Sequence, residues 1–162
     1  MAREKPITLE INGRRETATV PSHRTLLEVL RGMGHVEVKS GCEKGDCGAC
    51  AVLVDGAAVD SCLTLAWTVE GRAITTVSGL GDADSPHPLQ QAFADSGAAQ
   101  CGYCTPGLIV AAQSLLSANP DPDEDDIRLA LSGNLCRCTG YTKVFEAVEQ
   151  AAGAMRARGG ES

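Results

Sequence analysis

The chain has 162 residues, with 14 Lys and Arg against 21 Asp and Glu and a formal net charge of −7. This acidic balance and an aromatic content of 3% exclude a typical nucleic-acid-binding protein, which needs basic patches and stacking side chains. No apolar stretch approaches the roughly 20 residues of a membrane span, and the N-terminus does not resemble a secretory signal. Eight cysteines in such a chain favour metal binding over disulfides and predict a cytoplasmic protein.

The first elements in chain order are a β-hairpin and a short helix. Ile7 to Ile11 alternates apolar and polar residues, and Glu16 to Val20 is the expected return strand. Asn12-Gly13 between them is a strong signal for a hairpin turn. Thr25 to Arg31 carries leucines on one helical face and Gly32 follows, so we expect a helix that ends at Arg31.

A cysteine-rich loop follows this helix. Cys42, Cys47 and Cys50 have C-x4-C-x2-C spacing, and Cys62 follows a short apolar segment. Plant-type ferredoxins use this spacing to bind a [2Fe–2S] cluster. Three glycines interleave the cysteines and allow the backbone to turn its amides toward an anionic core. The alternatives are a zinc knuckle and a disulfide knot, although zinc sites usually pair two short cysteine clips.

Further β signals complete the first half of the chain. Ala51 to Val54 and Ala57 to Val59 flank Asp55-Gly56, which predicts a second hairpin, and Ala73 to Val77 predicts one more strand. This order of hairpin, helix, metal loop, hairpin and strand indicates an α+β domain of the β-grasp kind over residues 1–78.

A linker separates this domain from a helical one. The segment from Ser78 to Pro88 is rich in Gly, Pro and acidic residues, and we place the linker at residues 79–88. Residues 89–162 then have helical patterns and predict an all-α four-helix bundle. The expected helices are Leu89 to Asp95, Pro106 to Ala118, a helix capped by Asp123 that ends near Leu131, and Thr142 to Met155, with a frayed tail from Arg156.

The helical half contains the other four cysteines. They form the clips Cys101-x-x-Cys104 and Cys136-x-Cys138. We expect Thr105 to be an N-cap that opens one helix directly after Cys104, and Cys138 to open the last helix in the same way. Two helix N-termini that face one ligand would stabilise an anion such as a [2Fe–2S] core with four thiolates. The alternative is a structural zinc site with four cysteine ligands.

Three motifs together resemble the signatures of one protein family. They are Gly41-Cys42…Cys47-Gly-Ala-Cys50, Gln100-Cys-Gly-Tyr-Cys-Thr-Pro-Gly107 and Gly133-Asn-Leu-Cys-Arg-Cys-Thr-Gly-Tyr141. Over nearly its whole length the chain resembles the small iron–sulfur subunit of the molybdenum hydroxylases, the xanthine dehydrogenase and aldehyde oxidoreductase group. The segment between Leu30 and Cys42 is slightly shorter than the family pattern and lacks its Leu-Thr-Gly.

The resemblance implies two [2Fe–2S] clusters, one in a ferredoxin-like β-grasp domain and one in a helical bundle. It also implies a large partner subunit that binds the molybdenum cofactor and, in many members, a further subunit that binds FAD. Gln100 and Cys138 would approach the pterin of the molybdenum cofactor. The implied ligands are Cys101, Cys104, Cys136 and Cys138 for the cluster nearer the molybdenum, and Cys42, Cys47, Cys50 and Cys62 for the outer one.

The expected function is therefore that of an electron-transfer subunit in a hetero-oligomeric oxidoreductase. Electrons would pass from the molybdenum cofactor through both clusters to FAD or another acceptor. The chain shows no catalytic triad, phosphate loop or dinucleotide fingerprint, and we expect no substrate chemistry from it alone. The alternatives are a free-standing ferredoxin-like electron carrier and a zinc-stabilised interaction module.

Overall fold

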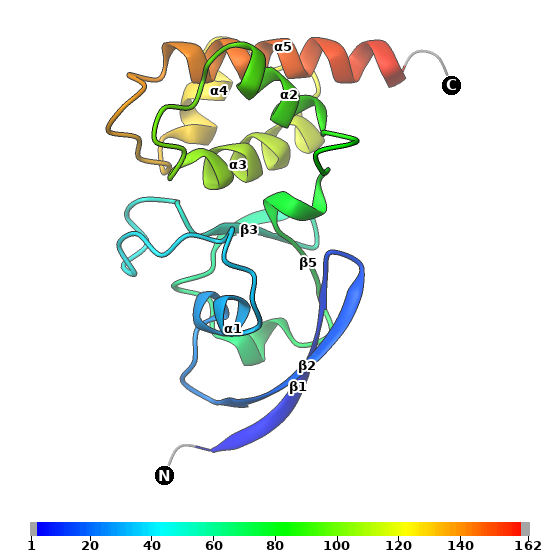
Figure 1. Cartoon of the computed structure of the whole chain (residues 1–162), viewed down its shortest axis with the longest axis vertical. Coiled ribbons are helices and arrows are strands. Elements are labelled where there is room, and N and C mark those ends of the chain that lie inside the picture. The colour runs from blue at the N-terminus through cyan, green and yellow to red at the C-terminus, as the bar shows by residue number, and fades with distance from the viewer. Residues whose placement is uncertain (1–2, 160–162) are drawn as a thin grey trace.

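A computed structural model describes residues 3–159, which form five strands and five α-helices in a mixed α/β arrangement (Figure 1). The strands make one sheet with the order β2-β1-β5-β3-β4. β1 and β5 are parallel, and the other neighbouring pairs are antiparallel. The strands are β1 (Glu4–Ile11), β2 (Arg14–Pro21), β3 (Ala51–Val54), β4 (Ala57–Asp60) and β5 (Ala73–Thr75).

Both predicted hairpins are confirmed. Asn12 and Gly13 have φ angles of 50° and 75°, and Asp55 and Gly56 have 49° and 85°. Two consecutive residues with positive φ are the requirement of a type I′ turn, whose twist matches the twist of antiparallel strands. The turns therefore fix the register of β1 with β2 and of β3 with β4.

Helix α1 (Leu26–Gly32) packs against one face of this sheet. Thr25 caps it, because the Thr25 hydroxyl accepts the Glu28 amide while the Glu28 carboxylate accepts the Thr25 amide. Leu26 and Leu30 are fully buried among the inward side chains of β1, β3 and β5. Gly32 is the last helical residue and Met33 is the C-cap, so the helix ends one residue later than expected.

The second half of the chain is helical and lies beside the sheet, at the top of Figure 1. One buried cluster joins its four helices. In the part of the chain described, none of the helices is long and apolar enough to cross a membrane. The helices are α2 (Pro88–Asp95), α3 (Thr105–Ala118), α4 (Glu124–Leu131) and α5 (Thr142–Gly159), and the short 3-10 helices are η1 (Ala66–Val69) and η2 (Val77–Gly79).

Helix α3 lies between the sheet and the other helices (Figure 1). Alternate residues of β3 serve two cores: Val52 and Val54 pack with α1, whereas Ala51 and Leu53 pack against Val110 of α3. All four residues of β3 are consequently buried. α3 is apolar on nearly all sides because it contacts the sheet and the other helices at the same time.

The structure corrects several expected boundaries. β5 ends at Thr75, because the Thr76 amide and hydroxyl bind the side chain of Asn12 and the chain then forms η2. α5 continues through the expected frayed tail to Gly159. Arg156 holds that end through an ion pair with Asp121 of 2.7 Å. The rest of the expected tail, residues 160–162, lies outside the described residues.

Candidate metal centres

The first cysteine quartet lies in and beside the loop between α1 and β3. We call Cys42, Cys47, Cys50 and Cys62 the loop quartet. The backbone amides of Lys44 and Asp46 donate to the Cys42 Sγ at 3.4 and 3.3 Å. These two donors lower the pKa of Cys42 to about 7. Such donors stabilise a thiolate, which is the form that binds iron.

The tight path of this loop depends on positive φ angles, at Glu43 (55°), Gly45 (79°) and Gly48 (65°). At Gly48 an added Cβ would also collide with the Asn134 side chain and the Gly133 carbonyl. The loop therefore needs glycine at position 48 for its backbone angle and for a close approach to a distant segment.

Cys50 and Cys62 form the buried side of the loop quartet. Burial raises the pKa of the Cys50 thiol to about 12. A thiol of this kind is protonated at neutral pH unless a metal replaces the proton. Its chemistry therefore suits a metal ligand better than a free nucleophile.

The second quartet, which we call the helical quartet, consists of Cys101, Cys104, Cys136 and Cys138. Burial raises the pKa of Cys104 to about 12. Burial also raises the pKa of Cys136. The hydroxyl and amide of Thr139, however, donate to the Cys136 Sγ at 3.1 and 3.4 Å and lower its pKa to about 7. Cys101 and Cys138 are exposed at the surface.

Two details of the expected helix starts are wrong. Cys104 is the N-cap of α3, and Thr105 is already its first helical residue, with a buried hydroxyl that has no hydrogen-bond partner. Cys138 does not open α5, because Tyr141, with φ of 68°, separates it from the helix start at Thr142. Only α3 therefore begins at the helical quartet.

Within each quartet the thiols meet in pairs. Cys101 and Cys138 have their sulfur atoms 3.7 Å apart. The remaining pairs in side-chain contact are Cys42 with Cys47, Cys50 with Cys62, and Cys104 with Cys136. Among residues 3–159 no group of three or more His, Cys, Asp or Glu side chains is placed to hold a single metal ion. Two thiol pairs are what a [2Fe–2S] core requires, since each of its irons takes two protein ligands.

The two quartets are joined by direct contacts between their loops. The Leu135 amide donates to the Cys47 carbonyl at 2.9 Å, and the Asn134 side chain donates to the Gly48 carbonyl at 3.0 Å. Tyr103 donates from its hydroxyl to the Ser40 carbonyl at 2.5 Å. Because Leu135 precedes a cysteine of one quartet and binds a cysteine of the other, the separation of the quartets is fixed by backbone hydrogen bonding.

Gln100 and Cys138, the two residues expected near a pterin, lie together at the surface. The Gln100 side-chain amide donates to the Cys138 carbonyl at 3.1 Å, and both residues are exposed. Sequence reasoning did not single out Asn134 or Thr139. The positions of Asn134 and Thr139 within the third motif were the only signal available for them.

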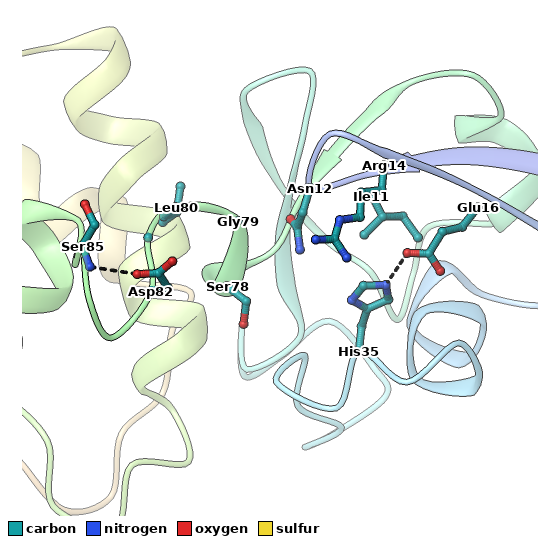
Figure 2. A pocket seen from close by; sticks show the side chains of 11 residues that line it. Ile11, Asn12, Arg14, Glu16, His35, Ser78, Gly79, Leu80, Asp82 and Ser85 are labelled. Carbon is teal, nitrogen blue, oxygen red and sulfur yellow. Dashed lines mark hydrogen bonds and ion pairs between the residues drawn. The ribbon is translucent and has the colours of Figure 1, made fainter.

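A polar cleft of about 510 Å³ lies away from the cysteines (Figure 2). Asn12, Arg14, Glu16 and His35 line one side, and the segment 78–85 lines the other. The His35 ring lies 3.2 Å from the Glu16 carboxylate and 3.4 Å from that of Glu37. These contacts connect the first hairpin to the segment before the loop quartet. A structural role therefore accounts for His35 and Glu16 in the cleft.

Family models for [2Fe–2S] binding domains match both halves of the chain. The family model described as "2Fe-2S iron-sulfur cluster binding domain" matches residues 9–76, and the one described as "[2Fe-2S] binding domain" matches residues 76–149. The chain is 51% identical over 148 residues to the nicotine 6-hydroxylase small subunit of Paenarthrobacter nicotinovorans, covering 91% of this chain and 89% of that protein. The chain belongs to the iron–sulfur subunits of the molybdenum hydroxylase family.

Other relatives agree with this assignment. The xanthine dehydrogenase iron–sulfur-binding subunit of Escherichia coli O157:H7 is 45% identical over 91% of this subunit and 96% of its own length. The solved structure of quinoline 2-oxidoreductase from Pseudomonas putida 86 superimposes with a TM-score of 0.90 and 43% identity, covering 98% of this subunit and 99% of that chain. Aldehyde oxidoreductase from Desulfovibrio gigas gives a TM-score of 0.91 at 41% identity, covering 95% of this subunit but 17% of that chain.

This iron–sulfur subunit therefore binds [2Fe–2S] clusters and transfers electrons within an oxidoreductase. Several of the relatives are named as subunits of larger oxidoreductases, which does not favour the alternative of a free-standing carrier. The matches also leave no support for a zinc-stabilised interaction module.

Proposed function

We propose that this subunit carries electrons from a molybdenum cofactor on a large partner subunit, by way of the helical quartet and then the loop quartet, to FAD or another acceptor. When bound, the clusters supply one-electron redox chemistry that protein side chains lack. The observation that carries the proposal is the pairing of the thiols into two quartets whose loops are joined by the hydrogen bond from Leu135 to Cys47.

The proposed ligand sets follow from the same pairing. In the helical quartet, Cys101 with Cys138 would hold one iron and Cys104 with Cys136 the other. In the loop quartet, one iron would be held by Cys42 with Cys47 and the other by Cys50 with Cys62. The protein's own contribution is to donate hydrogen bonds to the sulfurs, to bury one side of each quartet and to hold the quartets at a fixed separation.

We propose that the exposed side of the helical quartet faces the molybdenum-binding partner. Cys101, Cys138 and Gln100 are at the surface and in contact, so a cofactor held by another subunit could reach them. The much longer aldehyde oxidoreductase chain, of which this subunit matches 17%, supports a close association with further enzyme parts. The proposed assembly is therefore a hetero-oligomer with a molybdenum subunit and an FAD subunit. We place it in the cytoplasm, where thiols stay reduced.

The domain division is part of the proposal. We assign residues 1–78 to a ferredoxin-like β-grasp domain, residues 79–88 to a linker and residues 89–162 to a four-helix bundle. The family matches at 9–76 and 76–149 support a division near this point. The linker is held in place, since the Gln90 side chain donates to the carbonyls of Val77 and Gly81 at 3.0 Å each.

Stopped-flow reduction of the holoenzyme by its substrate tests the order of the quartets. With Cys47→Ser the thiolate at the loop quartet becomes a poor iron ligand, so substrate should still reduce the molybdenum and the helical-quartet cluster while turnover with acceptor collapses. With Cys138→Ser the substrate should reduce molybdenum, but neither cluster should be reduced rapidly. The reverse pattern, in which only the Cys47 variant blocks reduction at the helical quartet, would show that the order is backwards. Iron content and subunit composition are the controls, because a ligand substitution can also loosen the fold.

A further inference from the structure

A carboxylate lies against the loop quartet. Asp60 is the last residue of β4, and its Oδ1 accepts a hydrogen bond from the Cys50 thiol, with the two atoms 3.7 Å apart. Its backbone is fixed, since its carbonyl oxygen accepts the Leu63 amide and the Thr64 hydroxyl, each at 3.0 Å. Asp60 also pairs with Ala51 in the β3–β4 ladder, which places it beside Cys50.

The Asp60 side chain also lies near the backbone of the cysteine loop. Its Oδ2 lies 3.8 Å from the position that a Cβ on Gly45 would occupy, between two cysteines of the loop quartet. The ion pairs formed by residues 3–159 do not include Asp60, so no Lys or Arg within salt-bridge distance neutralises it. The residue is only partly exposed, which limits screening of its charge by water.

Both quartets receive hydrogen-bond donors, but the helical quartet differs in its carboxylates. There the Cys136 sulfur accepts hydrogen bonds from the hydroxyl and the amide of Thr139. Among the described residues no carboxylate forms a hydrogen bond to a sulfur of that quartet. Hydrogen-bond donors favour the more negative, reduced state of a cluster, whereas a nearby negative charge opposes reduction.

We propose that Asp60 lowers the reduction potential of the cluster held by the loop quartet and is a positioning residue for electron transfer through this subunit. The inference rests on the proposed ligand assignment. Reduction adds one electron from the donor to the cluster and forms or breaks no bond. The Asp60 charge acts only through the energy of that added electron. It therefore makes the loop-quartet cluster a weaker acceptor than its backbone amide donors alone would make it.

The test is an equilibrium redox titration of the holoenzyme with dithionite, followed by electron paramagnetic resonance. Asp60→Asn removes the charge with little change of shape, and Asp60→Glu keeps the charge. Asp125→Asn, in the exposed first turn of α4, is the control for a change in net charge. The signal lost in Cys47→Ser identifies the loop-quartet cluster, and spin integration establishes beforehand that two clusters are present.

We expect Asp60→Asn to raise the potential of the loop-quartet cluster by at least a tenfold change in its reduction equilibrium constant, which corresponds to 59 mV for one electron. The other cluster should keep its potential, Asp60→Glu should restore most of the low value, and Asp125→Asn should change neither. An unchanged loop-quartet potential, or an equal shift of both clusters, would overturn the inference. Asp60→Ser is the second neutral variant; if neither neutral variant assembles this cluster, Asp60 serves assembly and the inference is wrong. A wild-type subunit that integrates to a single cluster would refute the ligand assignment itself.

Discussion

A substitution at Gly107 tests whether close contact between α3 and the cysteine loop holds the two halves of the chain together. Gly107 is buried in the first turn of α3. A Cβ added there would lie 3.1 Å from the Gly48 carbonyl carbon, 3.2 Å from the Ala49 Cα and nearer still to the Gly48 carbonyl oxygen. All three are backbone atoms, so a change of side-chain rotamer cannot relieve the collision.

Two opposing effects set the size of the change at Gly107. Alanine is favoured over glycine inside a helix by about 1 kcal/mol. Against this, overpacking of a tight contact costs about 1–3 kcal/mol, and a displaced loop would also weaken hydrogen bonds of about 1 kcal/mol each, such as that from Asn134 to Gly48. The net effect of Gly107→Ala should be a loss of roughly 1–3 kcal/mol of folding free energy.

Gly153→Ala is the matched control. Gly153 lies inside α5, and an added Cβ there would meet nothing within 4 Å beyond the neighbouring residues and backbone of its own helix. The same substitution should therefore stabilise the protein by about 0.5–1 kcal/mol. The two variants have identical chemistry and differ only in what surrounds the new methyl group.

Thermal loss of the visible iron–sulfur absorption at one fixed heating rate is a suitable assay, because release of the clusters makes unfolding irreversible. At about 2–4 °C per kcal/mol for a chain of this size, Gly107→Ala should lower the midpoint by roughly 2–12 °C. Gly153→Ala should raise the midpoint by roughly 1–4 °C. If Gly107→Ala proves as stable as Gly153→Ala, the close approach of α3 to the loop is not a feature of the folded protein.

Two further variants probe single hydrogen bonds. Thr139→Val removes the hydroxyl that donates to the Cys136 sulfur and should lower the reduction potential of the helical-quartet cluster by the equivalent of about 1 kcal/mol. Thr139→Ser keeps the hydroxyl and should keep the potential. A redox titration measures both variants, and equal potentials would contradict the assigned hydrogen bond. Tyr103→Phe removes the bond to the Ser40 carbonyl and should lower the thermal midpoint by about 2–4 °C, with no change in iron content; an unchanged midpoint would show that this bond does not stabilise the loop.

Local signals were sufficient to predict most of the elements. Asn12-Gly13 and Asp55-Gly56 specify turns by their own backbone preferences, and Asp123 caps α4 through the same chemistry that the sequence suggested. The cysteine spacings likewise singled out the two sets of four cysteines as candidate cluster ligands. Each of these features depends on residues that are close together in the chain.

Features that depend on distant contacts could not be predicted in this way. The pairing of Asn134 with the Gly48 carbonyl spans 86 residues, and nothing in the spacing of either motif reveals it. The continuous apolar run of β3 is typical of a strand with two buried faces, but the sequence did not reveal that α3 covers the second face. The sequence analysis did not single out Asp60, because only the fold places its carboxylate beside the Cys50 sulfur.

The central claim is that one chain holds two separate [2Fe–2S] clusters in the two quartets. Chemical analysis together with electron paramagnetic resonance of the dithionite-reduced holoenzyme tests it most directly. Two cores of two irons predict about four irons and four sulfides per chain, no stoichiometric zinc, and two distinct signals, of which one disappears in Cys47→Ser and the other in Cys138→Ser. A single signal that integrates to one spin per fully reduced chain would contradict the account.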